Sequence, residues 1–369
     1  MDPRAYWVGF NMVKGIGAVR LRALLDFFGD LKIAWQAPAD ALRAAGLPQK
    51  PLETFLQIRH QVDLEQIWQR ILSQNIQVLI WEDAHYPRRL KEIEQSPPVL
   101  YVRGLLSPED DWAVAVVGTR RVTPYGRQVA DELARFLAGH GVTVVSGLAR
   151  GVDTVAHQTA LRSGGSTIAV LGSGVDRIYP PEHERLAAEI MQHGAVISDY
   201  APGTNPDAAN FPPRNRIISG LSLATVVVEA GETSGALITA TFAAEQGREV
   251  FAVPGPIYSP NSKGTNRLIR DGARPLLNME EILEVLNLGR IEQKKSARKI
   301  IPGDAREAQL LDCMSSSAMH IDDIANRSGL PIDQVSATLA MMELKGMVQQ
   351  VGGMTYAVIC ESQSNYGVA

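Results

Sequence analysis

Short apolar runs alternate with amphipathic segments through the middle of the chain. The runs predict strands, and the longer segments with one apolar face predict helices between them. Because apolar residues fill the runs almost continuously, the strands suit a sheet that is covered on both faces. The pattern predicts an α/β fold with a doubly wound parallel sheet. The expected strands are Ala113–Val117, Val142–Val145, Thr167–Leu171, Ala195–Ser198, Thr225–Glu229 and Glu249–Val253, and the expected helices are Tyr125–Gly139, Val152–Arg162, Glu182–His193, Ile217–Ser222 and Leu237–Glu245.

The segment before this sheet has a different pattern. Residues 1–85 are expected to be all-helical, and residues 12–17, Met-Val-Lys-Gly-Ile-Gly, resemble a helix-hairpin-helix turn. Such a turn could offer backbone amides to a DNA phosphate, but a small helical packing domain with a glycine turn explains the pattern as well, because the segment lacks a basic cluster. From Tyr86 to Gly104 prolines interrupt the pattern, which predicts an extended connector with a short strand at Val99–Val102.

The C-terminal part reads as a winged helix. A helix at Met279–Asn287 closes the sheet domain (residues 86–287), and the basic segment 288–303 reads as a linker. Residues 304–360 then suggest three helices and a β-hairpin, and residues 361–369 a tail. From Asp304 onward there are three basic and eight acidic residues, a net charge of −5. This charge favours protein contact or packing over DNA reading by the expected winged helix. Its expected elements are Ala305–Met314, Ile321–Arg327, Ile332–Lys345 and the hairpin Met347–Val358.

Composition narrows the class of protein. A length of 369 residues predicts two or three domains, and 45% hydrophobic with 21% charged residues is ordinary for a soluble protein. The formal charge of −4 argues against a uniformly basic nucleic-acid binder, although a local patch could serve. Two cysteines make no disulfide framework. With no signal-peptide pattern and no membrane-spanning apolar run, we expect a cytoplasmic protein without membrane contact.

Polar and glycine-rich residues follow the expected strands where each strand ends. Because the carboxyl ends of parallel strands meet at one edge of a sheet, these residues are expected to line one crevice. Glycine turns let backbone amides approach an anion, and arginines add positive charge, so the crevice is expected to bind phosphates. The candidates are Gly118, Thr119, Arg120, Ser146, Gly147, Arg150, Gly172, Ser173, Gly174, Arg214, Asn215, Arg216, Ser234 and Gly235, with Arg177, Lys263 and Asn266 as auxiliary residues.

Several motifs typical of enzymes are missing from the sequence. The chain has no Gly-x-x-x-x-Gly-Lys-Ser/Thr, no Gly-x-Gly-x-x-Gly after the first sheet strand and no Gly-x-Ser-x-Gly elbow. His157 and His183 lack the spacing of metal ligands. We therefore expect no catalysis, no cofactor and no metal. An electropositive crevice with several phosphate subsites suits a polyanion such as single-stranded nucleic acid.

Several long motifs in the same order resemble the DprA (also called Smf) family. The resemblance runs from about Tyr86 to Leu286, and both flanks match appendages of that family. It implies a Rossmann-like, non-catalytic domain that binds and protects single-stranded DNA, forms homodimers and loads RecA recombinase in natural transformation. The motifs are GTRRVTPYG, SGLARGVDTVAHQTAL, AVLGSGVDRIYPPEH, FPPRNRIISGLS, VVVEAGETSGALITATFAAEQGREVFAVPG and GTNRLIRDGA.

The resemblance also assigns residues. The family's strand-binding Gly-Ser-Arg motif falls on Gly118–Arg120, with Thr119 in place of serine, and its Arg-Asn-Arg motif falls on Arg214–Arg216. Some relatives carry a lysine soon after the Tyr-Pro that is Tyr179-Pro180 here, so that phosphate contact is either missing or supplied elsewhere, for example by Arg177 or Arg185. Two rival functions are a phosphoribohydrolase-type enzyme and a winged-helix regulator. The first lacks its Pro-Gly-Gly-x-Gly-Thr fingerprint here, and the acidic C-terminal part argues against the second.

Overall fold

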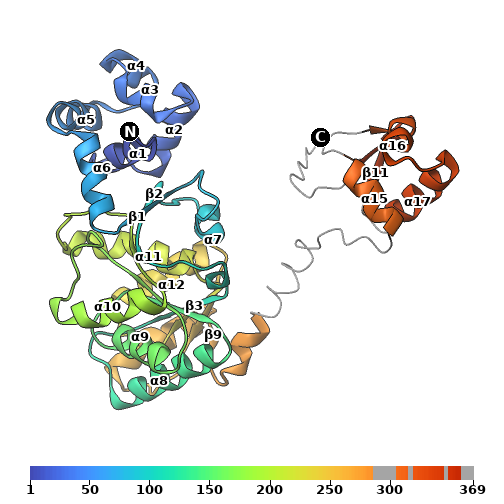
Figure 1. The fold of residues 1–369 in the computed structure, drawn as a ribbon. Helices are drawn as coiled ribbons and strands as arrows, with labels where there is room; N and C mark the ends of the chain where they lie inside the picture. The colour runs from blue at the N-terminus through green and yellow to red at the C-terminus, as the bar shows by residue number, and fades with distance from the viewer. Residues whose placement is uncertain (286–304, 315–318, 345–347, 359–369) are drawn as a thin grey trace. The chain divides into compact units, whose positions relative to one another are not determined.

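The chain folds into two compact units that divide after Leu286, and each is described by itself (Figure 1). This computed structural model describes residues 1–285, 305–314, 319–344 and 348–358. The expected linker 288–303, the tail 361–369 and the end of the helix expected at Met279–Asn287 lie outside these ranges, although residues 280–285 are helical. Among the described residues no helix combines the length and the apolar character needed to cross a bilayer.

The first unit is built on a mostly parallel sheet, as the sequence predicts. Its strand order is β1-β2-β6-β5-β4-β3-β7-β8-β9. Strands β3 to β9 pair in parallel, whereas β2 is antiparallel to both β6 and β1. The strands are β1 Gln77–Ile80, β2 Val99–Gly104, β3 Ala113–Val117, β4 Thr143–Ser146, β5 Thr167–Val170, β6 Ala195–Ser198, β7 Ala224–Val227, β8 Glu249–Ala252 and β9 Arg274–Pro275.

Strand β1 corrects the all-helical interpretation of residues 1–85. Its four residues pair with β2, from Gln77 opposite Val102 to Ile80 opposite Val99. The run from Ile76 to Ile80 is short and apolar except for Gln77, and such runs do not separate strand from helix by periodicity alone. Pairing with a distant strand therefore decides the structure of this segment.

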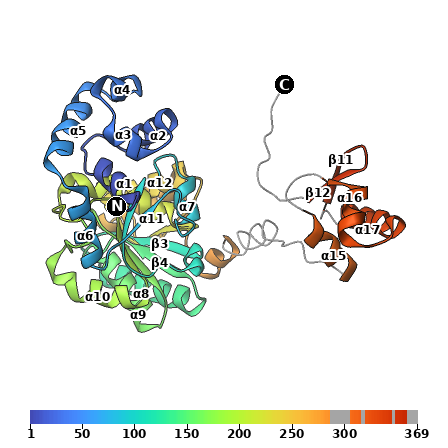
Figure 2. The same ribbon diagram turned by 45° about the horizontal axis from the view of Figure 1, so that its top comes forward.

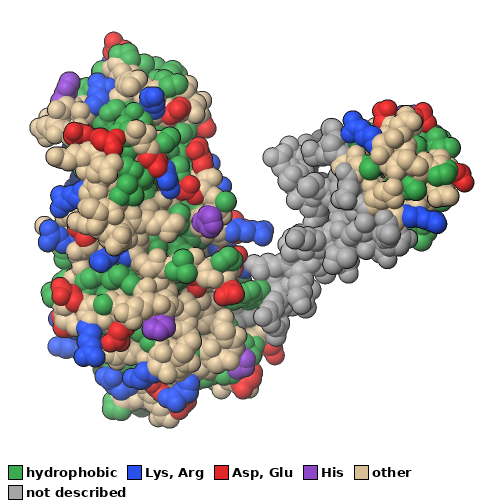
Figure 3. Space-filling model, viewed as in Figure 1, with side chains coloured by type: hydrophobic (Ala, Val, Ile, Leu, Met, Phe, Trp, Pro, Cys, Tyr) green, Lys and Arg blue, Asp and Glu red, His purple; other side chains and the backbone are tan. Residues whose placement is uncertain are grey.

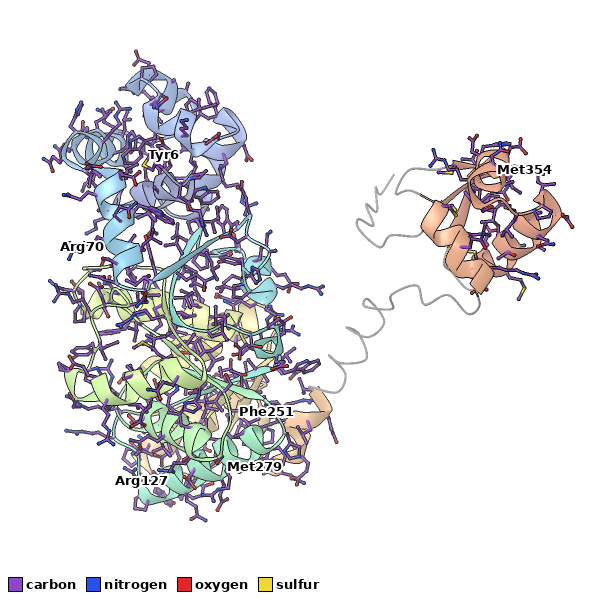
Figure 4. All side chains as sticks on the ribbon, in the orientation of Figure 1. Tyr6, Arg70, Arg127, Phe251, Met279 and Met354 are labelled. Carbon is purple, nitrogen blue, oxygen red and sulfur yellow. The ribbon has the colours of Figure 1, made fainter. Side chains whose placement is uncertain are left out.

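Helices cover both faces of the sheet (Figures 1 and 2). Along β3, Val114 and Val116 pack with α8 and α9, whereas Ala115 and Val117 belong to the core that includes α11 and α12. This alternation follows from the two-residue repeat of a strand. Phe251 of β8, labelled in Figure 4, is fully buried in the first of these cores. The helices are α8 Pro124–Gly139, α9 Val152–Arg162, α10 Glu184–His193, α11 Phe211–Gly220, α12 Gly235–Glu245 and α13 Lys263–Arg270.

Helix α11 begins six residues earlier than the expected Ile217. Two prolines, Pro212 and Pro213, occupy its first positions, where a missing N–H and a fixed φ do not interrupt helical hydrogen bonding. Arg214 and Arg216 therefore lie in the first two turns of this helix. Their neighbours are set by the helix rather than by a free loop.

The N-terminal helices share a hydrophobic core with the sheet. Phe10, Trp35 and Phe55 form an aromatic cluster, with the Phe10 and Phe55 rings stacked at 4.9 Å. Asn11 joins the helices to the sheet, because it accepts a hydrogen bond from the Tyr101 hydroxyl and donates one to the Asp199 carbonyl. The helices are α1 Arg4–Asn11, α2 Ala18–Phe28, α3 Leu31–Gln36, α4 Ala39–Ala44, α5 Gln49–Gln61 and α6 Leu64–Ser73, followed by α7 Arg88–Glu92.

The second unit has the expected helix-turn-helix and hairpin. Three helices pack on a small antiparallel sheet of order β10-β12-β11. Its core includes Leu310, Ile324, Leu339 and Val348, all fully buried. The elements are α15 Ala305–Cys313, β10 Met319–His320, α16 Ile321–Ser328, α17 Ile332–Leu344, β11 Val348–Gly352 and β12 Thr355–Val358.

Candidate functional site

A groove of about 770 Å³ lies at the carboxyl ends of β3 and β7. Strand β3 lies between β4 and β7, so the chain winds outward from it in both directions. Such a topological switch point is where open α/β sheets bind ligands. The groove is lined by the loop after β3, the first turns of α11 and α12, and the side chain of Asn261. The expected crevice is therefore present at the edge that the sequence predicts.

Arg120 is one of two exposed arginines that line this groove, the other being Arg121. The Arg120 guanidinium group lies 5.6 Å from the centre of the Phe211 ring, and no hydrogen bond or ion pair engages it within the described ranges. The ring of Tyr179 lies 5.6 Å from that of Phe211, at an angle of 31°. The sequence analysis did not assign Phe211 and Tyr179 to the site. The signal was available, because each aromatic residue lies within a few positions of an arginine.

Arg214 lines the same groove but is only 5% exposed. Its Nη1 donates to the carbonyl oxygens of Gly147 and Val170, and its Nε has no partner among the described residues. Burial lowers the pKa of the Arg214 guanidinium to about 10, while Asp153 acts against this shift. Arg214 thus stays charged at neutral pH and places a fixed positive charge in the floor of the groove.

The loop after β4 is held by hydrogen bonds to a buried carboxylate. The Asp153 carboxylate accepts hydrogen bonds from the amides of Gly147 and Ala149. Burial raises the pKa of Asp153 to about 6, and Arg214 opposes that rise. Ser146 is buried and donates to the Val116 carbonyl. Ser146 and Gly147 therefore shape the loop rather than face solvent.

Arg150 is the exposed residue of this loop, and it pairs with Glu182 at 2.6 Å. The two side chains are 61% and 49% exposed, so solvent weakens their attraction. Together with Arg120, Phe211 and Tyr179, Arg150 also lines a small pocket that adjoins the groove. An incoming anion could compete with Glu182 for this guanidinium.

The turn Gly172–Gly174 is packed beneath the groove instead of lining it. A Cβ on Gly172 would lie 2.8 Å from the Phe211 ring, so glycine lets the ring rest on the backbone. The Gly174 amide donates to the Thr204 carbonyl, and the Ser173 hydroxyl donates to the Arg177 carbonyl. These groups are engaged within the protein. The side chain of Arg177 is exposed.

Arg216 does not face the groove, which corrects the expectation that it shares one crevice with Arg120. Its Nη2 pairs with Asp199 at 2.8 Å, and the two side chains are 12% and 14% exposed. Its other nitrogens donate to the carbonyls of Gln95 and Pro213. Because residues two apart on a helix point in different directions, Arg214 and Arg216 cannot share one face of α11. The anionic partner of Arg216 is therefore the Asp199 carboxylate of the protein itself.

The far wall of the groove is the N-terminus of α12. Ser234 caps this helix by accepting from the Ala236 amide, and Gly235 is exposed. Asn215 donates to the Gly235 carbonyl, which ties α11 to α12. Unpaired amides and the helix dipole favour a negative charge at this end.

Two of the auxiliary residues, Asn266 and Lys263, hold the loops after β8 and β7. Asn266 exchanges two hydrogen bonds with the backbone of Gly255, and Lys263 pairs with Glu232 at 3.4 Å. Neither lines the groove, whereas Asn261 does, and its side chain donates to the Arg121 carbonyl.

The loops at the switch point are pressed together by backbone contacts. The Thr119 amide donates to the Glu229 carbonyl at 2.7 Å, and the Val152 amide donates to the Thr119 carbonyl. Gly151 has φ +82°, and a Cβ there would lie 2.2 Å from the Thr119 carbonyl oxygen. The Glu229 carboxylate holds the start of α8 by accepting from the Thr123 amide and hydroxyl. This bracing fixes Arg120 at the lip of the groove.

Acidic and basic side chains are interspersed on the face shown in Figure 3. Within the described ranges, no three His, Cys, Asp or Glu residues gather as a metal site would require. His157 is fully buried against Thr167, and burial lowers its pKa to about 3. The arrangement combines two exposed arginines, one buried arginine, two aromatic rings and a helix N-terminus around a groove. It is suited to hold phosphates and to stack planar rings.

Comparison with known proteins places the chain in one family. The family model of DNA recombination-mediator protein A matches residues 77–287, and that of the DprA winged helix domain matches residues 294–354. Protein Smf of Synechocystis is 36% identical, with 96% of this chain and 98% of the relative covered. Protein Smf of Escherichia coli is 39% identical, with 91% and 93% covered.

Two solved structures are similar as well. The X-ray structure of DNA processing protein A from Streptococcus pneumoniae has a TM-score of 0.68 and 33% identity, with 76% of this chain and 97% of that chain covered. A structure of DNA processing protein A from Helicobacter pylori, described for its single-stranded DNA binding mode, has a TM-score of 0.52 and 31% identity, with 58% and 96% covered. These matches confirm the resemblance drawn from the motifs: the chain belongs to the DprA (Smf) family of DNA recombination-mediator proteins.

Proposed function

We propose that this protein binds single-stranded DNA along the groove at the carboxyl edge of its sheet, without catalysing a reaction. One observation carries the proposal: Arg120 is exposed over the Phe211 ring at the topological switch point, and no other described residue forms a hydrogen bond or ion pair with its side chain. A phosphate can approach the guanidinium group while a neighbouring base stacks on an aromatic face. The similar protein from Helicobacter pylori, whose structure is described for its single-stranded DNA binding mode, supports single-stranded DNA as the ligand.

The groove favours a single strand over a duplex. Stacking on Phe211 or Tyr179 requires unpaired bases, which a duplex keeps inside its own stack. Contacts with phosphates alone carry no sequence information, so binding is expected to be tolerant of sequence. Because each neutralised phosphate of a single strand releases counterions, affinity falls with salt with a log–log slope of about −0.7 per phosphate.

The test is a salt titration of fluorescence anisotropy with labelled oligothymidine and with a duplex of equal length. Arg120→Glu should weaken strand binding at least tenfold and flatten the salt slope. The control is Arg135→Glu, because Arg135 is also exposed but lies in the last turns of α8, which run away from this edge of the sheet. Arg135 pairs with Asp131, so thermal melting of this variant should accompany the titration. Tighter binding of the duplex, or equal affinities of Arg120→Glu and wild type, would contradict the proposal.

Family membership also supports finer proposals. We infer that the protein acts in the cytoplasm as a homodimer through its sheet-containing unit, and that it protects incoming strands and loads RecA recombinase onto them. Sedimentation equilibrium of the full chain tests the dimer. RecA loading is tested by the lag of RecA ATPase activity on strands coated with single-strand-binding protein, which this protein should shorten and Arg120→Glu should not.

A further inference from the structure

A tight turn beyond the groove presents two large apolar side chains to solvent. Ile257 and Tyr258 are 72% and 90% exposed. They are the central residues of a turn closed by the hydrogen bond from the Ser259 amide to the Pro256 carbonyl. Glycine, asparagine, aspartate and proline usually occupy such positions, and large apolar residues gain nothing there from burial. Their exposure on a turn beside the groove makes them candidates for contact with a ligand.

This turn is held in place at both ends. On one side the Tyr125 hydroxyl donates to the Pro254 carbonyl, and Asn266 clamps Gly255. On the other side the Asn261 carbonyl accepts from the Ala230 amide. A side chain on a braced turn loses less conformational freedom when it binds than one on a loose loop.

The same bracing makes the turn continuous with the groove. Asn261 lines the groove, and a Cβ on Gly231 would lie 3.5 Å from the Pro260 carbonyl oxygen. Tyr258 is two residues from Pro260, and each residue advances the chain by at most about 3.8 Å. Arg121, which is exposed, also lines the groove, and its carbonyl accepts a hydrogen bond from the Asn261 side chain. The turn that carries Tyr258 therefore continues from the β8 side of the groove.

We propose that Tyr258 is a second stacking platform, which takes a base of the strand after it has left the groove. The inference rests on the proposed binding of single-stranded DNA and adds its direction across the sheet edge. The strand runs from Tyr179 and Phe211 at one end to Tyr258 at the other. Tyr258 therefore sets the number of nucleotides bound, whereas Arg120 sets whether binding occurs.

The test compares the full-length wild type with Tyr258→Ala on oligothymidines from about 4 to about 16 nucleotides, the span of known single-strand site sizes. Short strands that fill only the groove should bind both proteins equally. Longer strands should bind Tyr258→Ala about 5- to 150-fold more weakly, the loss expected for one base–aromatic contact. Tyr258→Phe and Tyr258→Trp should keep wild-type affinity, because they keep the ring.

Leu105→Ala is the matched control, because Leu105 is 70% exposed and follows β2 in the other half of the sheet. It should leave every affinity unchanged. Equal binding of Tyr258→Ala and wild type at all lengths, while Arg120→Glu still fails to bind, would overturn this inference and leave the proposed function intact. A change in the oligomeric mass of Tyr258→Ala would also overturn it, since the turn would then contact a second copy of the chain. If Arg120→Glu bound the strands as tightly as the wild type, that result would instead contradict the proposed function itself.

Discussion

The guanidinium group of Arg120 lies 5.6 Å from the centre of the Phe211 ring, and the two residues come from different edges of the groove. A cation over an aromatic face at an exposed site gains about 0.5–1 kcal/mol, enough to orient the arginine without neutralising it. The same ring lies 6.0 Å from the buried guanidinium of Arg214. The Phe211 ring thus lies beside an accessible arginine, Arg120, and a buried structural arginine, Arg214.

Replacing Phe211 by leucine tests the role of the ring. Leucine keeps apolar contact with the backbone at Gly172 but offers no face to a base or to Arg120. We expect the affinity for oligothymidine to fall about 5- to 150-fold, the range for one stacked base. Phe211→Tyr should bind like the wild type, and thermal melting should show both variants folded. A wild-type affinity for Phe211→Leu would mean that the ring only packs.

Replacing Arg216 should affect stability before binding. Arg216→Gln leaves the Asp199 carboxylate, 14% exposed, without its ion pair, and breaking such a pair costs about 3 kcal/mol. Asp199→Asn in the same chain should recover part of that loss, because no charge is then left unpaired. Urea unfolding of the single and double variants measures the coupling. Independent, additive losses would contradict the pairing, and a loss of strand binding in the fully folded double variant would return Arg216 to the site.

The sequence predicted the sheet and a crevice at the carboxyl ends of its strands, because the strands are apolar and the glycine turns mark their ends. It also predicted that Arg120 lies at this edge. It could not separate Arg214 from Arg216. Both follow the same two prolines, and only the helical rotation between them sends one toward the Gly147 carbonyl and the other toward Asp199. Long-range partners of this kind leave no local pattern.

The turn Gly172–Gly174 shows the same limit. A Gly-Ser-Gly after a parallel strand is what a phosphate-binding loop requires, and it is equally what a close ring–backbone contact requires. The Phe211 ring packs on the backbone of Gly172, and the Gly174 amide donates a hydrogen bond to the Thr204 carbonyl. The sequence analysis did not assign the aromatic residues of the groove to the site, because their pattern has a simpler structural explanation. They resemble ordinary core residues until the fold brings them beside an arginine.

Removing the second unit should leave strand binding nearly intact. Every residue assigned to the groove precedes Leu286, where the chain divides into its two compact units. The residues from Asp304 onward carry a net charge of −5, so they repel phosphates. A chain that ends at residue 287 should bind oligothymidine within about threefold of the full chain, because its phosphate contacts are unchanged. A larger loss in anisotropy would assign strand contacts to residues 288–369, and a chain ending at residue 303 would show whether the basic segment 288–303 supplies them.

Acidification should weaken the fold through His157. This side chain is fully buried, and burial lowers its pKa to about 3, whereas in the unfolded chain it is about 6.5. The unfolded state therefore takes up the proton first, so the stability due to neutral His157 is complete above pH 6.5 and is lost as the pH falls. Between pH 7 and pH 5 the free energy of unfolding should drop by about 2 kcal/mol from this group alone.

Tryptophan fluorescence during urea unfolding measures this loss, because all five tryptophans precede residue 113 and report the first unit. His157→Gln, which keeps a hydrogen-bonding group beside Thr167, should lose about 2 kcal/mol less than the wild type between pH 7 and pH 5. Asp153 acts with the opposite sign, because its raised pKa makes the folded state take up a proton as the pH falls toward 4. That contribution is common to both proteins and cancels in the comparison. An equal drop in the two proteins would show that His157 does not control the acid sensitivity of the fold.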